Sequence, residues 1–216
     1  MIQTDTTSQE IILFDTSVLL PLTYHMLELK SANVNFSIQD VLDKINDKKL
    51  GIQKKVKAQT LKHFSDKNSK YEEDAKDYLQ NFEYIHDGDD SHYNTELYRW
   101  YNMMVDNPDS VRSNDWISLK KMQLIKQGYK VPENKSDLKN MKDKQRALSA
   151  LRDSVSRGSD RQILAQAMKA SENLKIIFIT NDGDHIVLKD AIEIFTKNQL
   201  SVYRPKKIPH INIYKT

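Results

Sequence analysis

The sequence predicts an α/β fold with a central parallel sheet flanked by helices. Short apolar segments rich in β-branched and aromatic residues stand at 11–14, 175–180 and 200–203, and longer amphipathic segments separate them. Buried strands that alternate with helices are typical of a parallel sheet covered on both faces. With 216 residues, 38% hydrophobic residues, 5 Gly and 5 Pro, the chain is expected to form one soluble, helix-rich domain.

The first part of the chain begins with the strand at 11–14. Residues 38–45 carry apolar side chains at helical spacing, and Ser37 is the expected N-cap of this helix. A short extended segment at 51–52 precedes the next helix. From 61 to 82, apolar side chains recur every three or four residues, which predicts one long helix with a single packing stripe.

The second part is predicted as a loop followed by helices and then by alternating helices and strands. An acidic, turn-rich segment predicts the loop, and Pro and Gly residues mark several helix ends. The expected elements are a loop at 81–94, helices at 97–105, 114–126, 138–155 and 159–170, a strand at 175–180, a helix at 185–198 and a strand at 200–203.

Composition narrows the kinds of site that the protein can contain. The chain has no Cys, which excludes disulfides and thiolate zinc sites and leaves carboxylates and His as metal ligands. No apolar run approaches the roughly 20 residues of a membrane span. The first ten residues are polar and acidic rather than signal-like, so we expect a cytoplasmic protein.

Positive charge is concentrated in residues 120–161. This segment holds twelve basic and five acidic residues, a net charge of +7, although the whole chain carries only +3. Such asymmetry is expected of a surface that binds a polyanion, but solvated helices of Lys-rich proteins show it as well. The residues we expect to contact the polyanion are Lys139, Lys142, Lys144, Arg146, Arg152, Arg157 and Arg161.

Carboxylates directly follow two of the predicted strands. Asp15 ends the apolar run at 11–14, and Asp182 and Asp184 follow the strand at 175–180. A carboxylate placed among apolar residues needs hydrogen bonds, a counter-charge or a metal ion. Because ligands of parallel sheets bind at the carboxyl ends of the strands, these side chains are expected to meet at one edge.

Asp160 opens the helix predicted at 159–170 and is the fourth candidate acid. It lies on the helical stripe formed by Ile163, Leu164 and Ala167, and we therefore expect it to point inward. Taken singly, each acid also has a structural explanation as a helix cap or a turn residue. Several carboxylates at one edge repel one another, however, and an all-oxygen cluster suits Mg²⁺ or Mn²⁺.

Three motifs together resemble the strongest motifs of the PIN-domain ribonucleases. They are ILFDTSVLL near the start, SDRQILAQA about 145 residues later and FITNDGDH soon after it. The resemblance covers roughly residues 11–64 and 154–205. It implies a PIN-like three-layer sandwich with a central parallel sheet flanked by helices, as a single domain over residues 8–216.

The resemblance also implies an activity and a set of site residues. It implies an endoribonuclease that binds Mg²⁺ or Mn²⁺ and hydrolyses single-stranded or structured RNA. By motif, Asp15, Asp160, Asp182 and Asp184 are the catalytic and metal-binding acids, and Thr180 is the hydroxyl residue that supports their turn. The polyanion is then RNA, and a homodimer and an inhibitory antitoxin are the protein partners that the family suggests.

One departure from the family concerns a fifth acid. The family usually has a Glu early in the helix after the second short strand, where this chain reads VKAQTLKHF. The position falls on Gln59 or Thr60, and Thr60 is favoured as the pocket residue because it shares the packing stripe of Phe64. The alternative function is therefore a catalytically degenerate PIN-fold RNA-binding or assembly protein.

The second departure is the length of the chain, which predicts a helical insertion at about 83–144. Such an insertion could extend the RNA-binding surface, mediate dimerisation or shield the pocket. Its acidic start resembles a metal site, but it lacks the Gly and Glu of a calcium loop and is expected to be solvated. A flap-endonuclease-type enzyme and an aspartyl phosphatase are disfavoured, because neither a helical-hairpin DNA motif nor a second acid two residues after Asp15 is present.

Overall fold

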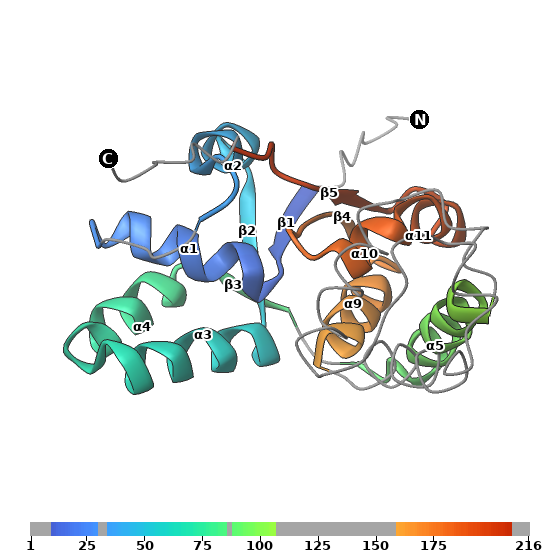
Figure 1. Ribbon diagram of the computed structural model, residues 1–216, viewed down its shortest axis with the longest axis horizontal. Helices are drawn as coiled ribbons and strands as arrows, with labels where there is room; N and C mark the ends of the chain where they lie inside the picture. The colour runs from blue at the N-terminus through green and yellow to red at the C-terminus, as the bar shows by residue number, and fades with distance from the viewer. Residues whose placement is uncertain (1–9, 30–33, 86–87, 107–158, 209–216) are drawn as a thin grey trace, which may run out of the picture.

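The computed structural model describes residues 10–29, 34–85, 88–106 and 159–208 (Figure 1). In these residues five strands form one parallel sheet in the order β3-β2-β1-β4-β5. The strands are β1 (Glu10–Phe14), β2 (Lys49–Gln53), β3 (Glu83–Ile85), β4 (Lys175–Ile179) and β5 (Leu200–Tyr203). The helices predicted at 114–126 and 138–155 lie outside the described residues.

Helices cover both faces of this sheet, which confirms the predicted fold class. Figure 1 shows α1, α3 and α4 on one side of the strands and α5, α9 and α11 on the other. The described helices are α1 (Thr16–Met26), α2 (Ile38–Ile45), α3 (Lys54–Lys67), α4 (Glu72–Gln80), α5 (Ser91–Asp106), α9 (Ser159–Ala170), α10 (Gly183–Val187) and α11 (Lys189–Phe195).

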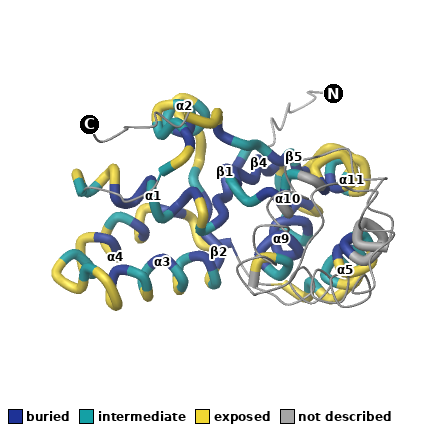
Figure 2. The backbone as a smooth tube through the Cα atoms, in the orientation of Figure 1, coloured by how far each residue is buried: buried dark blue, intermediate teal, exposed yellow. Residues whose placement is uncertain are grey.

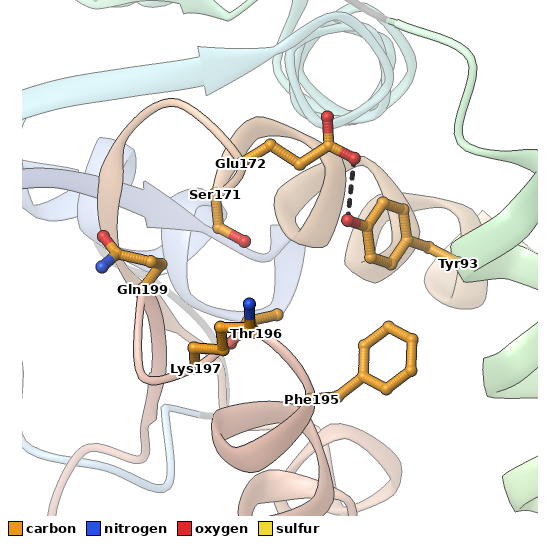
Figure 3. Close-up of a pocket in the computed structure, with 7 residues that line it drawn as sticks. All are labelled: Tyr93, Ser171, Glu172, Phe195, Thr196, Lys197 and Gln199. Atoms are coloured by element: carbon orange, nitrogen blue, oxygen red, sulfur yellow. Dashed lines mark hydrogen bonds between the residues drawn. The ribbon is translucent and has the colours of Figure 1, made fainter.

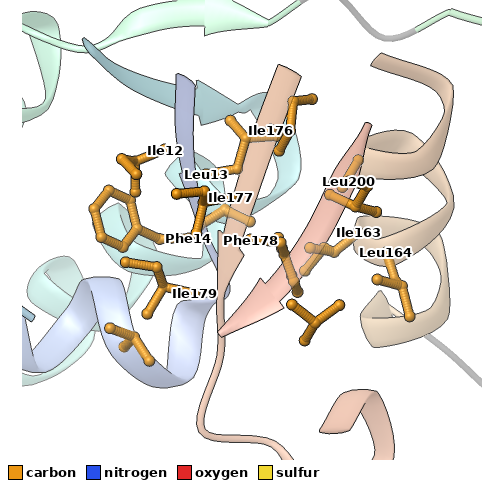
Figure 4. Packing of buried hydrophobic residues seen from close by; sticks show 14 of the residues in the cluster. Ile12, Leu13, Phe14, Ile163, Leu164, Ile176, Ile177, Phe178, Ile179 and Leu200 are labelled. Carbon is orange, nitrogen blue, oxygen red and sulfur yellow. The ribbon is translucent and has the colours of Figure 1, made fainter. Parts of the chain in front are cut away.

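The core lies on both faces of the two central strands. Leu13 of β1 pairs with Phe178 of β4, so their side chains share the face covered by α9, and both are fully buried. Figure 4 shows Ile163 and Leu164 reaching from α9 toward this face. In Figure 2 the buried positions concentrate in the strands and on the helix sides that face them. The central strands are therefore apolar throughout, as in other sheets buried on both faces.

Gly51 allows β2 to pack closely on β1. A Cβ atom added at this position would lie 2.8 Å from Leu13 Cδ2, 2.9 Å from Ile11 Cγ2 and 3.1 Å from Ile85 Cγ1. All three neighbours are buried, so the space is filled before any side chain is added. A residue without a side chain is thus required at the centre of β2.

The prediction of one long helix over 61–82 is wrong, because the helix is interrupted at Asn68. The N–H of Asn68 donates to the Phe64 carbonyl, and its backbone leaves the helical region at φ −146° and ψ 51°. A short 3₁₀ turn, Ser69–Tyr71, then leads into α4. The Asn68 amide donates to the hydroxyl of Tyr24 in α1, and this contact holds α3 and α4 as a hairpin against α1.

Other boundaries also differ from the predictions. The loop expected at 81–94 contains β3, and α5 begins within it at Ser91. The helix expected at 185–198 is two helices, α10 and α11, with a turn at Leu188 between them. In contrast, Ser37 caps α2 as predicted, since its hydroxyl accepts the N–H of Asp40 at 3.2 Å.

Candidate functional site

Asp15 lies at the carboxyl end of β1 and is 4% exposed. Its backbone N–H donates to the Ile179 carbonyl of β4 at 2.9 Å, which holds it at the edge between the two central strands. Its Oδ2 atom accepts hydrogen bonds from Ser17 Oγ at 2.5 Å and from Thr180 Oγ1 at 3.1 Å. These hydroxyl groups supply part of the compensation that a buried carboxylate needs.

The Thr180 hydroxyl connects three parts of the site. It donates to Asp15, accepts the backbone N–H of Asp182 at 3.0 Å, and lies 3.2 Å from Nδ1 of His185. A hydroxyl has one proton and two acceptor positions, so these three contacts use its full capacity. Thr180 therefore fixes the turn after β4 relative to the end of β1.

His185 is a buried residue of the site that the sequence analysis did not identify. Its Nε2 lies 3.2 Å from the backbone oxygen of Asp160, which only accepts, so Nε2 carries a proton. The ring also packs edge-on against Phe178, with ring centroids 5.5 Å apart.

Electrostatic interactions show that the acids converge. Burial is the largest effect on Asp15 and raises its pKa, and the negative charges of Asp182 and Asp160 raise it further. The charge of His185 and the hydrogen bond from Ser17 act in the opposite direction, but the net effect is a raised pKa. The folded protein therefore resists full ionisation of this carboxylate unless another cation is present.

The other predicted acids differ in how far they are exposed to solvent. Asp182 is half-buried, whereas Asp160 is exposed, so the expectation that the Asp160 side chain points inward is wrong. Asp160 is in the first turn of α9, before the buried stripe that begins at Ile163, and its backbone oxygen lies 3.2 Å from Nε2 of His185. The backbone of Asp184 is in α10, but its side chain lies outside the described part of the structure.

Gln53 is a second residue that the sequence analysis missed. It ends β2, and the register of β2 against β1 places it beside Asp15 on the face that α9 covers. It is 2% exposed, and its Nε2 donates to the Ile163 carbonyl of α9 at 3.0 Å. Its Oε1 is buried without a hydrogen-bond partner. A buried amide oxygen of this kind is an available ligand for a cation or a water molecule.

The two residues expected in place of the family Glu have different surroundings. Gln59 Oε1 accepts the Thr16 hydroxyl at 2.5 Å, so Gln59 is tied to the residue that follows Asp15. Thr60 is fully buried on the core-facing stripe of α3 between Val56 and Phe64. Its hydroxyl has no hydrogen-bond partner. Of Gln59 and Thr60, Gln59 is therefore the one connected to the edge of the sheet where Asp15 lies.

Two basic side chains flank the start of α9. Arg161 Nε donates to Asn94 Oδ1 in α5 at 2.5 Å, and Lys55 Nζ donates to Gln162 Oε1 at 2.6 Å. Both contacts are made at the first turn of α9, where Arg161 and Gln162 follow Asp160. The six other basic residues predicted to contact a polyanion, all within 139–157, lie outside the described residues.

The oxygen atoms at this site are of the chemical type that binds a hard divalent cation. Carboxylates and an unpartnered amide oxygen are the ligands that Mg²⁺ and Mn²⁺ prefer. In the described part of the chain, however, no three Asp, Glu or His side chains lie close enough together to form a metal site. The acidic loop before α5 shows a structural use instead, since Asp89 accepts the N–H of Ser91 at 3.0 Å.

A separate pocket of about 320 Å³ lies at the other end of α9 (Figure 3). Ser171 and Glu172 follow α9 and Gln199 precedes β5, so this pocket is at the amino-terminal edge of the sheet, away from the acids. Tyr93 donates to Glu172 at 2.8 Å across it. Among the described residues, no helix combines the length and apolar character needed to cross a membrane.

Comparison with known proteins assigns no family to the chain. No family model matches the sequence, and no curated protein matches it. A solved structure of VapBC2 from Rickettsia felis, bound to a DNA fragment from their promoter, is similar over 91% of this chain and 99% of that chain. Its TM-score is 0.44 and its sequence identity is 14%, values too low to support an argument about function.

Proposed function

We propose that the protein is a metal-dependent endoribonuclease of the PIN-domain type. The observation that carries the proposal is the electrostatic state of Asp15, a buried carboxylate whose pKa is raised by burial and by Asp182 and Asp160. Such an arrangement is unfavourable without a cation and is common at functional sites. The three sequence motifs supply the same acids.

The proposed metal ligands are Asp15, Asp160, Asp182 and Asp184, with the Gln53 amide oxygen as an added neutral donor. These residues would hold Mg²⁺ or Mn²⁺, which would supply an activated water and neutralise charge on the scissile phosphate. Ser17 and Thr180 orient Asp15 through its Oδ2 atom. His185 holds Thr180 against the backbone of Asp160, so the end of β1, the turn after β4 and the start of α9 are connected.

The proposed RNA contacts are Lys139, Lys142, Lys144, Arg146, Arg152, Arg157 and Arg161. Contacts of this type neutralise backbone phosphates, give affinity that falls with salt, and carry little sequence information. The homodimer and the inhibitory antitoxin remain predictions from the resemblance.

The test is cleavage of a labelled single-stranded RNA by purified protein with Mn²⁺, Mg²⁺ or EDTA. We expect cleavage with metal, none with EDTA, and a loss of at least 100-fold in rate for Asp15→Asn and Asp182→Asn. The matched control is Asp77→Asn, an exposed carboxylate on α4, which should cleave as the wild type does. Equal cleavage by Asp15→Asn and Asp77→Asn would show that Asp15 has no part in the reaction.

The second candidate is an RNA-binding protein without catalysis. The observation that favours it is Gln59, a neutral side chain linked to Thr16 where the family usually has an acid. Salt-sensitive RNA binding with no cleavage under any metal would establish this alternative.

A further inference from the structure

A lysine without an acidic partner lies near the acidic edge, which is the edge of the sheet with Asp15 and Asp182. Lys55 is half-buried in the first turn of α3, and its ammonium group donates to Gln162 Oε1 in α9 at 2.6 Å. Among the described residues Lys55 forms no ion pair. An ammonium group has three N–H donors, and the neutral amide oxygen uses one of them. The charge and two donors are therefore left for an anionic ligand.

The position of Lys55 is fixed first through its neighbour on the same helix face. Lys55 and Gln59 are four positions apart in α3, so their side chains lie on one face. Gln59 Oε1 accepts the hydroxyl of Thr16, the residue that directly follows Asp15, at 2.5 Å. This face of α3 thus contacts the start of α1 through Gln59 and the first turn of α9 through Lys55.

The end of β2 brings Lys55 to the same edge. Gln53 is the last residue of β2, the register of β2 against β1 places it beside Asp15, and Lys55 follows it by two positions. The Gln53 amide donates to the Ile163 carbonyl of α9 at 3.0 Å, so both Gln53 and Lys55 hold the start of α3 against α9. In Figure 1 the first turns of α3 and α9 face each other below the ends of the central strands.

The amino acids at the start of α3 also favour an anion. Its first turn contains Lys54, Lys55 and Lys57 and no acidic residue, and Gln53 provides no side-chain cap. The amino-terminal end of a helix is its positive end, where a lysine lowers stability and an anion raises it. Three lysines at this end are therefore unfavourable in the free protein and become favourable when an anion is bound.

We propose that Lys55 binds a backbone phosphate of RNA at the acidic edge. The ammonium group contacts the phosphate with the donors that Gln162 leaves unused. This assignment rests on the proposed function, which brings the RNA backbone to Asp15. A lysine recognises the phosphate as a point charge and does not read the base, so little sequence preference is expected.

The test measures binding of a fluorescein-labelled ten-nucleotide single-stranded RNA to the full chain in EDTA, by anisotropy at several salt concentrations. Lys55→Met removes the charge but keeps an unbranched side chain. It is expected to raise the Kd about 5-fold at 0.1 M salt and to lower the slope of log Kd against log salt by about 0.7, the value for one phosphate contact of a single strand. Lys55→Arg keeps the charge and should keep the slope.

The matched control is Lys67→Met, at an exposed position about 18 Å further along α3. Its salt slope should equal that of the wild type. Thermal unfolding of each variant verifies that it is folded. The same slope for the wild type, Lys55→Met and Lys67→Met would overturn the proposal, and so would the absence of RNA binding by the wild type at low salt.

Gln162→Ala separates phosphate binding from a structural role of Lys55. This change removes the hydrogen-bond partner of Lys55 and leaves its charge in place. The salt slope of Gln162→Ala is therefore expected to equal that of the wild type. If Lys55 only holds α9 through Gln162, then Lys55→Met and Gln162→Ala will change the Kd and the slope equally, and the proposal is wrong.

These binding measurements are independent of catalysis because EDTA prevents metal-dependent cleavage. A lower salt slope for Lys55→Met, together with no cleavage by the wild type in Mn²⁺, would reject the nuclease and support the phosphate contact. Cleavage by the wild type in Mn²⁺ with an unchanged slope for Lys55→Met would reject the phosphate contact and support the nuclease.

Discussion

The ionised carboxylate of Asp15 is needed for the proposed activity, but it lowers the stability of the folded protein without metal. Its carboxylate is buried and lies near two other negative charges, so ionisation destabilises the folded, metal-free protein. The hydroxyl groups of Ser17 and Thr180 reduce this penalty, and both could also donate to the oxygen of an amide in its place. An uncharged residue of the same shape should therefore fit the site.

Asp15→Asn is expected to raise the Tm at neutral pH by a few degrees in the absence of metal. The folded-state pKa of Asp15 is raised above its ordinary value of 3.8, so the wild type loses stability as the pH rises through that folded-state pKa. The difference in Tm between variant and wild type should be largest at neutral pH and should shrink below about pH 4. Thermal denaturation from pH 3.5 to 7.5 measures it, and a constant difference would contradict the raised pKa.

Gln59→Glu is expected to restore an acid at the edge without a change of shape. A glutamate still accepts the Thr16 hydroxyl, but its charge should lower the Tm without metal and increase the rise in Tm that Mn²⁺ causes. Thermal shift with and without Mn²⁺ measures both effects. Gln80→Glu, at an exposed position of α4, is the control. The same Mn²⁺ response for all three proteins would place Gln59 outside the metal site.

At the scale of elements, the contact between β1 and β2 depends on Gly51. Gly51→Ala is expected to destabilise the protein by about 1–3 kcal/mol, because the added methyl group overlaps the buried side chains of Leu13 and Ile11. Chemical denaturation measures the change in free energy of unfolding. Gly88→Ala, where a Cβ atom meets only the flexible Lys169 side chain at 3.4 Å, should change it by less than about 0.5 kcal/mol.

Elements with strong local signals were predicted well from the sequence. The apolar strands β1, β4 and β5 and the capped helix α2 have boundaries within one residue of the predictions. The interruption at Asn68 was missed, because the apolar spacing of α3 and α4 continues across it while a contact with Tyr24 decides the turn. Three-residue β3 was missed because such a short edge strand depends on pairing with β2.

The same reasoning explains which site residues were found. The sequence pointed to Asp15 and Asp182 because each carboxylate follows an apolar strand, and the structure brings their charges together. Gln53 also ends an apolar strand and could have been found by the same rule. His185 could not, because its role depends on contacts with Thr180 and with the backbone of Asp160, 25 residues away.

At the scale of the whole molecule, stability should decrease from the centre of the sheet to its edges. β1 and β4 have strand neighbours on both sides and helices on both faces, whereas β3 is a short edge strand. Hydrogen–deuterium exchange is expected to be slowest in β1 and β4 and fastest in β3. Protection of β3 equal to that of β1 would show that another part of the chain covers this edge.

The hydrogen bond between Thr180 and Asp15 joins residues separated by 165 positions in the chain. During synthesis at about 5–20 residues per second, β1 therefore leaves the ribosome roughly ten to thirty seconds before its partner β4 exists. A nascent chain that ends before β4 has Asp15 and Gln53 but neither Thr180 nor Asp182. The proposed site can therefore form only after β4 and the turn that follows it have been synthesised.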